Sequence, residues 1–274
     1  MTAISVSGMP YQRKEHYLAE IDTKWADLLL LACFFCSGLI DSMAFNMYGC
    51  FVSMQTGNTI FLGLGVTHQP TTSPPLSWSK SLIAILSFAL GALFFSTFHR
   101  TYGPQRRWVL VANFTLQSLL TAIVALVTTT GRIPNRPPAT TLTHSVSPTG
   151  EDLVTYTLPA TFPSSDYAPI AILAFQSAGQ IVASRVLKFN AMPTVVLTSL
   201  YCDLMSDARL FSAALGANGD RSRRLGGAVL LLGGAICGAL LGGSRVGFMG
   251  GLWIGCVIKG GMAGAWVVWR EKGV

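Results

Sequence analysis

The chain has 274 residues, of which 51% are apolar and only 11% are charged, and its formal net charge is +7. Ordinary soluble domains carry about 25% charged residues, so this composition excludes that class and predicts an integral membrane protein. Topology explains the basic surplus of such a protein, because Lys and Arg gather on its cytoplasmic side. We therefore expect no nucleic-acid partner.

Eight apolar segments have about the length that crosses a bilayer, for which a helix needs roughly 20 residues. They are 25–46, 50–66, 80–99, 108–129, 168–187, 192–211, 225–243 and 248–269. Segment 50–66 is short and carries Gln, Thr, Gly and Asn in its middle, so it is either a crossing helix or a broken, re-entrant one. The predicted fold is an all-α integral membrane protein, a polytopic bundle of six to eight transmembrane helices.

Residues 130–167 are rich in Pro, Ser and Thr and show neither a helical nor a strand period, which predicts a partly disordered linker. This linker divides the chain. A polar N-terminal tail (1–24) and a first membrane half (25–129) precede it, and a second membrane half (168–270) follows it.

A weak internal repeat relates the two membrane halves. Residues 32–62 align with residues 171–204 when Gly38 is laid on Gly179, which predicts two repeated halves. Four crossings in each half would make the repeats parallel, whereas a non-crossing segment would make them inverted, as is common in transporters.

The distribution of Lys and Arg predicts the orientation in the membrane. If all eight segments cross, the side that holds the N-terminus carries roughly twice as many of these residues as the other side. We therefore expect both termini in the cytoplasm of a multi-pass protein, whose membrane is the plasma membrane or an endomembrane.

Asp41 follows a run of apolar and small residues, 28–40. A charged group at mid-membrane costs roughly 2.5–3.5 kcal/mol on insertion scales, so Asp41 needs a partner. Arg185 is our first choice, because the Gly38/Gly179 alignment puts it three residues beyond the counterpart of Asp41, and Lys259 is the second. An unpaired Asp41 would instead be available to carry a proton.

Thr56-Gly57-Asn58, preceded by Gln55, interrupts the second apolar run. Glycine permits a helix break, and a break frees backbone groups to bind a solute or ion near the midplane. The alternative is a kinked helix whose polar side chains bond only its own backbone.

Two amide pairs, Asn113/Gln117 and Gln176/Gln180, have members four residues apart, which places each pair on one helical face. The pairs either offer donors and acceptors to a solute in a common cavity or link helices through hydrogen bonds. The predicted substrate-binding residues are Asp41, Gln55, Thr56, Gly57, Asn58, Gln176, Gln180 and Arg185.

Residue patterns for catalysis are lacking, since there is neither a Gly-x-Ser-x-Gly elbow nor a phosphate-binding loop. The four His have no ligand spacing, and Cys33 and Cys36 lie in a spanning segment without a second pair. We therefore expect no enzyme activity, metal or cofactor. Glycines four apart in the last two segments, such as Gly234 and Gly238, predict close helix packing.

Two motifs carry a resemblance to a known family. Residues 38–41 (GLID) and 51–59 (FVSMQTGNT) resemble the signature of the YoaK-like membrane proteins, the domain of unknown function numbered 1275. Residues 174–180 (AFQSAGQ) and 193–203 (PTVVLTSLYCD) resemble its fungal branch. The likeness covers about residues 25–270 and implies a compact polytopic membrane protein, but no activity. Thr198-Ser199 stands where the family usually has Thr-Gly, which leaves open whether the second half keeps a helix break.

Our functional hypothesis is a carrier or channel for a small polar solute or ion, embedded in the lipid bilayer. Asp41, Thr56, Asn58, Gln176 and Gln180 would line a central site, with Arg185 as the charge partner. The rival hypothesis is a non-transporting scaffold whose polar residues only lock helices together. A membrane-embedded enzyme is the third and weakest.

Overall fold

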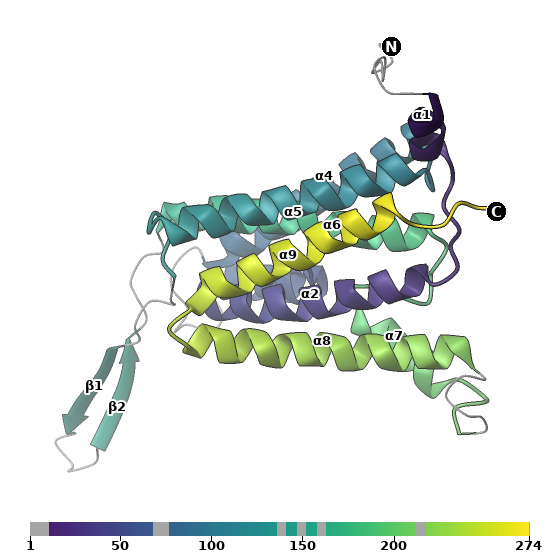
Figure 1. Ribbon diagram of the computed structural model, residues 1–274. Coiled ribbons are helices and arrows are strands. Elements are labelled where there is room, and N and C mark those ends of the chain that lie inside the picture. Colours follow the sequence, from purple (N-terminus) through teal and green to yellow (C-terminus); the bar gives the residue numbers. More distant parts are fainter. Residues whose placement is uncertain are drawn as a thin grey trace.

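Six long helices lie side by side in the computed structural model, which describes residues 11–67, 77–135, 141–146, 152–157, 163–211 and 218–273 (Figure 1). They are α2 (Ala26–Tyr48), α4 (Ser77–Tyr102), α5 (Arg107–Thr129), α6 (Tyr167–Val186), α8 (Gly219–Gly243) and α9 (Gly247–Val267). All of these except α6 are long and apolar enough to cross a membrane. The protein is therefore a multi-pass helical membrane protein.

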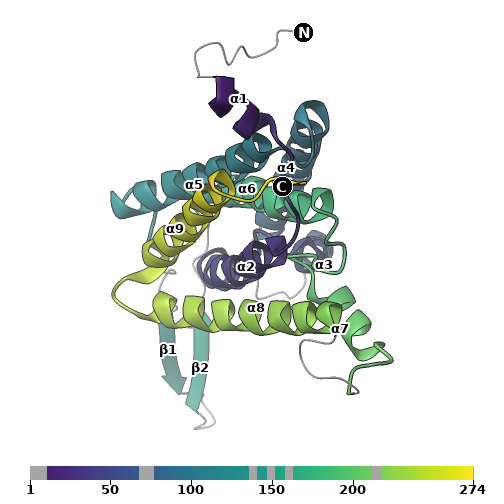
Figure 2. The same cartoon turned by 45° about the vertical axis from the view of Figure 1, so that its right-hand side comes forward.

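The two ends of the bundle differ. One end holds the short N-terminal helix α1 (Tyr11–Leu18) and the C-terminal residues, and we call it the terminal end (Figure 1). A β-hairpin lies at the opposite end, which we call the hairpin end, and the view in Figure 2 shows the same separation.

Each long helix of the first part of the chain packs on one from the second part: α2 on α8, α4 on α6 and α5 on α9. Glycine makes the first of these contacts close. A Cβ at Gly38 would lie 1.9 Å from the carbonyl oxygen of Leu231, and one at Gly234 would lie 2.1 Å from that of Phe35. The close packing predicted from the glycine spacing is thus confirmed at Gly234.

Two predicted crossing segments contain only short helices, α3 (Gln55–Val66) and α7 (Leu197–Met205). At 1.5 Å per residue they span about 18 and 14 Å, against a hydrocarbon core of about 30 Å. The prediction that 192–211 forms a crossing helix is therefore wrong, and 50–66 follows its re-entrant alternative.

Both short helices begin at mid-depth in the bundle. The chain before α3 is hydrogen-bonded to Asp41 in the middle of α2, and Gly65 near its end packs on Trp78 at the start of α4. The chain before α7 is bonded to Ser37 of α2, and Asp203 near its end lies beside Arg224 at the start of α8. Since α4 starts at the hairpin end and α8 at the terminal end, α3 and α7 run in opposite directions.

The region predicted to lack regular structure contains the hairpin. Strands β1 (Thr141–Val146) and β2 (Asp152–Thr157) pair antiparallel, with Thr141 opposite Thr157. The expectation of no strand is wrong here, because Thr, Val and Tyr favour a pleated strand even where a clear alternation is missing. A 3-10 helix, η1 (Ser164–Asp166), then leads into α6.

The predicted polar tail is attached to the bundle where the structure describes it. The N–H of Ile21 donates to the carbonyl of Gln105 (3.0 Å), and the N–H of Asp22 donates to that of Arg270 (2.9 Å). The segment before α2 thus holds the α4–α5 turn and the C-terminal residues together.

Candidate functional site

A polar layer crosses the bundle at mid-depth, between two apolar clusters. The cluster toward the terminal end includes Leu30, Phe114 and Trp266, and the one toward the hairpin end includes Leu39, Ala125 and Phe248. The buried polar residues that separate them on α2, α5, α6 and α9 are Ser37, Asp41, Gln117, Thr121, Gln176, Ser177, Gln180 and Lys259. We call these residues the central polar layer.

Lys259 of α9 is the centre of this layer, and its side chain is 1% exposed. Its ammonium donates to the Oε1 atoms of Gln117 (2.7 Å), Gln176 (2.7 Å) and Gln180 (3.1 Å). An ammonium has three N–H donors, so three carboxamide oxygens from two helices satisfy all of them. Gln176 and Gln180 therefore share one face of α6, as their spacing predicts.

The hydrogen bonds continue from Gln117 toward the terminal end. Its Nε2 donates to Oδ1 of Asn113 (2.9 Å), and Nδ2 of Asn113 donates to Nε2 of His99 (2.9 Å). Nδ1 of His99 in turn donates to the carbonyl of Pro104 (3.0 Å). A continuous chain of polar groups thus joins Lys259 to the α4–α5 turn.

Asp41 is buried within the same layer and is bonded to the loop before α3. Its Oδ1 accepts the backbone N–H groups of Val52 and Ser53 (2.8 Å each), and its Oδ2 accepts the Ser53 hydroxyl. Three donors from the start of α3 thus hold the carboxylate, in the position where a helix N-terminus favours negative charge.

Asp41 and Lys259 face one small cavity together with Ser53, Gln176 and Gln180, and all five of these residues are buried. Its volume is about 10 Å³, close to the smallest space that holds one water molecule. The two charges therefore share an enclosure at mid-depth that has no room for a larger solute in this conformation.

Arg185 does not pair with Asp41, so the predicted ion pair is wrong. Arg185 is exposed in the last turn of α6, and its Nη1 donates to the carbonyl (3.2 Å) and Oδ1 (3.3 Å) of Asn190. Arg185 lies more than one helical turn beyond Gln180, nearer the terminal end than the central polar layer. Its guanidinium therefore extends toward the bundle surface, as long basic side chains near helix ends do. The second choice, Lys259, lies across the cavity from Asp41 without forming an ion pair with it.

Gln55 and Asn58 bond mainly the loop before their own helix. Oδ1 of Asn58 accepts the N–H of Phe51 (2.9 Å), while its Nδ2 donates to the carbonyl of Phe51 (2.7 Å) and to Oε1 of Gln55 (2.8 Å). Nε2 of Gln55 donates to the carbonyl of Val52 (3.0 Å). Thr56 is exposed and Gly57 packs on the Phe51 ring. The geometry therefore matches the alternative in which the polar side chains of this segment bond the backbone of their own segment.

Two serines connect the short helices to the opposite half of the chain. The hydroxyl of Ser37 in α2 donates to the carbonyl of Thr194 (2.9 Å), three residues before α7. The hydroxyl of Ser177 in α6 is shared between the carbonyl of Ala174 in its own helix (2.8 Å) and the carbonyl of Val52 (3.1 Å), three residues before α3. The first long helix of each half therefore holds the loop of the other half.

The family model DUF1275, described as a protein of unknown function, matches residues 29–265. The chain belongs to the DUF1275 family. Neither a curated protein nor a solved structure matches it. The matched range runs from α2 to α9, so the whole central polar layer of this DUF1275 protein lies within it.

Sequence reasoning missed several polar residues of the DUF1275 chain. His99 lies at the end of a predicted segment, and Lys80 forms a buried ion pair with Asp166 (2.7 Å) at the hairpin end. Ser37 and Ser177 are single hydroxyls within apolar runs. None of these positions differs in pattern from ordinary membrane sequence, and no group of three or more His, Cys, Asp and Glu suited to a metal occurs in the part of the chain that the structure describes.

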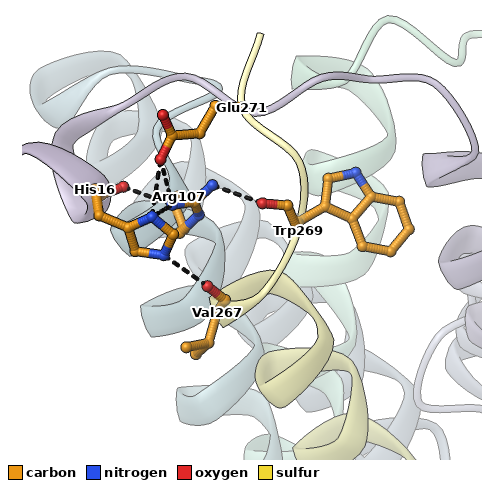
Figure 3. A network of polar contacts seen from close by, with 5 residues as sticks. All are labelled: His16, Arg107, Val267, Trp269 and Glu271. Carbon is orange, nitrogen blue, oxygen red and sulfur yellow. Dashed lines mark hydrogen bonds and ion pairs between the residues drawn. The ribbon is translucent and has the colours of Figure 1, made fainter. Parts of the chain in front are cut away.

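A second polar network closes the terminal end (Figure 3). Arg107, fully buried at the start of α5, donates to the carbonyls of His16 (2.8 Å) and Trp269 (2.6 Å) and to Oε1 of Glu271 (3.0 Å). His16 contacts Arg107 and Glu271 through Nδ1 and donates through Nε2 to the carbonyl of Val267 (3.0 Å). The Arg107 guanidinium, and next His16, hold the pKa of Glu271 below its ordinary value.

Proposed function

We propose that this DUF1275 protein is a membrane carrier for a small polar solute or ion, with its binding site in the central polar layer. The observation that carries this proposal is that an ammonium and a carboxylate face one cavity at the middle of a membrane bundle. Ionisable groups at this depth are expensive to insert and are found chiefly along substrate and ion pathways.

The arrangement of the two halves supports a carrier. If α6 crosses the membrane like the other five long helices, each half consists of three crossing helices and one short helix. The first half starts at the terminal end and the second at the hairpin end, so the two halves have inverted topology. Inverted halves whose discontinuous helices start at a midplane site are typical of secondary transporters. The loops before α3 and α7 both lie at this depth. Each is hydrogen-bonded to a long helix of the other half, the first through Ser177 and the second through Ser37.

In this proposal the described conformation is the occluded one. Lys259 is held by three glutamine oxygens and Asp41 by the start of α3, so each charge has internal partners while no solute is bound. A solute would replace some of these bonds when one half moves relative to the other and opens the cavity toward one side. Asp41, Gln176 and Gln180 would contact it together with Lys259, whereas Thr56 and Arg185 lie outside the site.

The charge distribution of a six-crossing topology supports termini in the cytoplasm. At the hairpin end the cations of the described residues are Lys80, Arg132 and Arg245. At the terminal end they are Arg13 and Lys14 of α1 together with Lys24, Arg100, Arg106, Arg107, Arg185, Lys188, Arg209, Arg221, Arg223, Arg224, Arg270 and Lys272. Because the excess of Lys and Arg marks the cytoplasmic side, the terminal end would face the cytoplasm.

A non-transporting scaffold is the second candidate. The small volume of the cavity favours it, since a scaffold needs a filled interior with paired polar groups. Yet a scaffold gains little from a buried ammonium, because replacing buried charges by apolar side chains of similar size is often neutral or stabilising.

Solute flux separates the two candidates. We would reconstitute the full chain in liposomes and follow osmotic re-swelling by light scattering after addition of urea, glycine or sodium acetate. A carrier gives faster re-swelling than empty liposomes for at least one solute. Lys259→Met and Asp41→Asn should slow it at least tenfold, while Arg245→Gln, an exposed change at the hairpin end, should not. Equal re-swelling with and without protein for all three solutes would favour the scaffold.

A further inference from the structure

A groove opens on the surface of the bundle between α4 and α6, at the terminal end. Its volume is about 500 Å³, and its lining includes Ser96, Arg100, Ile181, Val182, Arg185 and Val186. Volumes of roughly 300–1,000 Å³ are usual for small-molecule sites. This groove is separate from the central polar layer.

The groove lies at the depth expected for lipid headgroups. On the same end of α4, the rings of Phe98 and Tyr102 pack with that of Trp108, whose centroid is 5.6 Å from Phe98 and 5.2 Å from Tyr102. Such aromatic clusters mark the membrane–water interface. Leu93 and Phe94, about one to two turns deeper on α4, are exposed, so this side of the helix faces hydrocarbon.

The lining is divided chemically into a cationic part and an apolar part. Arg100 and Arg185 are both exposed, and no carboxylate lines the groove among the described residues. Arg185 forms its hydrogen bonds to Asn190 through Nη1, whereas a guanidinium has five donors whose planar arrangement matches a phosphate. Ile181, Val182 and Val186 supply aliphatic surface beside these charges.

We propose that this groove binds one anionic phospholipid of the surrounding bilayer. The phosphate lies between the guanidinium groups of Arg100 and Arg185, and an acyl chain lies on the aliphatic side chains of α6. Charge complementarity selects an anionic headgroup, and basic pockets between membrane helices on the cytoplasmic side are known to favour such lipids. Arg185 thus has a ligand outside the protein rather than Asp41 within it.

The test is native mass spectrometry of the purified full chain with phosphatidylglycerol or phosphatidylcholine added at equal concentrations. The parent should retain phosphatidylglycerol in preference to phosphatidylcholine. An Arg100→Gln/Arg185→Gln variant should lose this retention by about fivefold for each arginine. The matched control, Arg132→Gln/Arg245→Gln, removes the same charge at the hairpin end and should behave as the parent.

Three results would overturn the proposal. They are equal retention of both lipids by the parent, equal loss in the control variant, and complete displacement of phosphatidylglycerol by inorganic phosphate, which would indicate an anion site without a place for the acyl chain. Both arginines are exposed, so the variants should fold, and an Arg100→Lys/Arg185→Lys variant that keeps partial preference would support the role of charge.

Discussion

Lys259 and Asp41 are buried in one layer, but different parts of the chain accommodate their charges. Asp41 is bonded to Val52 and Ser53, at most 12 residues away, and these donors belong to the backbone and hydroxyl of one loop. Lys259 depends on side chains of α5 and α6, the farthest of them 142 residues away. Asp41 thus forms local hydrogen bonds to the loop before α3, whereas Lys259 links its own helix α9 to α5 and α6.

Polarity within apolar sequence was enough to select Asp41, Gln176 and Gln180 as interior residues, but it could not assign their partners. Arg185 and Lys259 are both cations in helices, and only the rotation and depth of α6 and α9 decide which one faces inward. Those properties depend on packing between distant segments, for which the sequence offers no local signal.

Glu271 gives a pH dependence at the terminal end. Because its pKa is lower in the folded protein than its ordinary value of 4.5, the ionised carboxylate stabilises the docked C-terminal residues at higher pH. This stabilisation is lost as the pH falls below 4.5 through the folded pKa. We expect the Lys272 amide, which donates to the carbonyl of Glu20 (3.0 Å), to exchange faster with solvent hydrogen below that pH, after correction for intrinsic rates.

The Glu271→Gln variant separates this effect from general acid unfolding. It should show faster exchange of the same amide at neutral pH, by about two- to fivefold as for a partly exposed ion pair, and little further change on acidification. Lys272→Gln, which removes the exposed pair with Glu20, should keep the pH dependence of the parent. An identical pH profile in Glu271→Gln and the parent would exclude Glu271 as its origin.

At the scale of elements, α3 shows how a helix start is stabilised at mid-membrane. Asn58 satisfies both the N–H and the carbonyl of Phe51, so Asn58→Ala leaves two backbone groups without these partners. Each lost partner costs about 1–3 kcal/mol when buried, and we expect a clear fall in the thermal unfolding temperature in detergent.

Thr56→Ala is the control from the same helical turn. Thr56 is exposed, and surface changes are usually worth no more than about 0.5 kcal/mol, so its unfolding temperature should match that of the parent. If both variants unfolded at the same temperature, Asn58 would not stabilise the loop.

The motif Thr56-Gly57-Asn58 is recognisable from sequence as an interruption of an apolar run, and such an interruption fits either a binding site or a kinked helix. The structure favours the second because Asn58 faces back toward its own loop. In residues 130–167, by contrast, the strands were not expected, since strand pairing depends on two segments meeting and their composition alone resembles a linker.

At the scale of the molecule, six crossings and eight crossings predict different sides for the α4–α5 turn. With α3 re-entrant, Thr101 lies on the same side as Lys24, and Thr67 lies on the opposite side together with Thr130. With 50–66 crossing, Thr101 would face away from Lys24. All four residues are exposed, so cysteine labelling can decide between the topologies.

The experiment introduces one cysteine at a time into a Cys202→Ser/Cys237→Ser/Cys256→Ser background, because Cys202 is exposed and Cys237 and Cys256 are half-buried. A membrane-impermeant maleimide is then added to sealed vesicles of known orientation. Lys24→Cys and Thr101→Cys should react from one side, and Thr67→Cys and Thr130→Cys from the other. Reaction of Thr101→Cys and Lys24→Cys from opposite sides would contradict the six-crossing arrangement.

The composition was enough to predict an all-helical membrane protein. The family match agrees with the resemblance in the motifs around Asp41 and Asn58. The repeat seen in the Gly38/Gly179 alignment left its own direction open. That direction depends on whether segments such as 192–211 cross, and hydropathy does not distinguish a nine-residue helix with flanking loops from a full crossing.

The separation between Asp41 and Lys259 along the chain has a consequence for biosynthesis. Chains are made from the N-terminus, and early parts fold while later parts are still on the ribosome. The carboxylate meets its donors as soon as residue 53 has entered the bilayer, but Gln117, Gln176 and Gln180 must wait for α9, the last helix to be inserted. A nascent protein lacking that helix keeps the partners of the three amide nitrogens but leaves the three carboxamide oxygens without the ammonium. Release of α9 from the ribosome is therefore the step that completes the central polar layer.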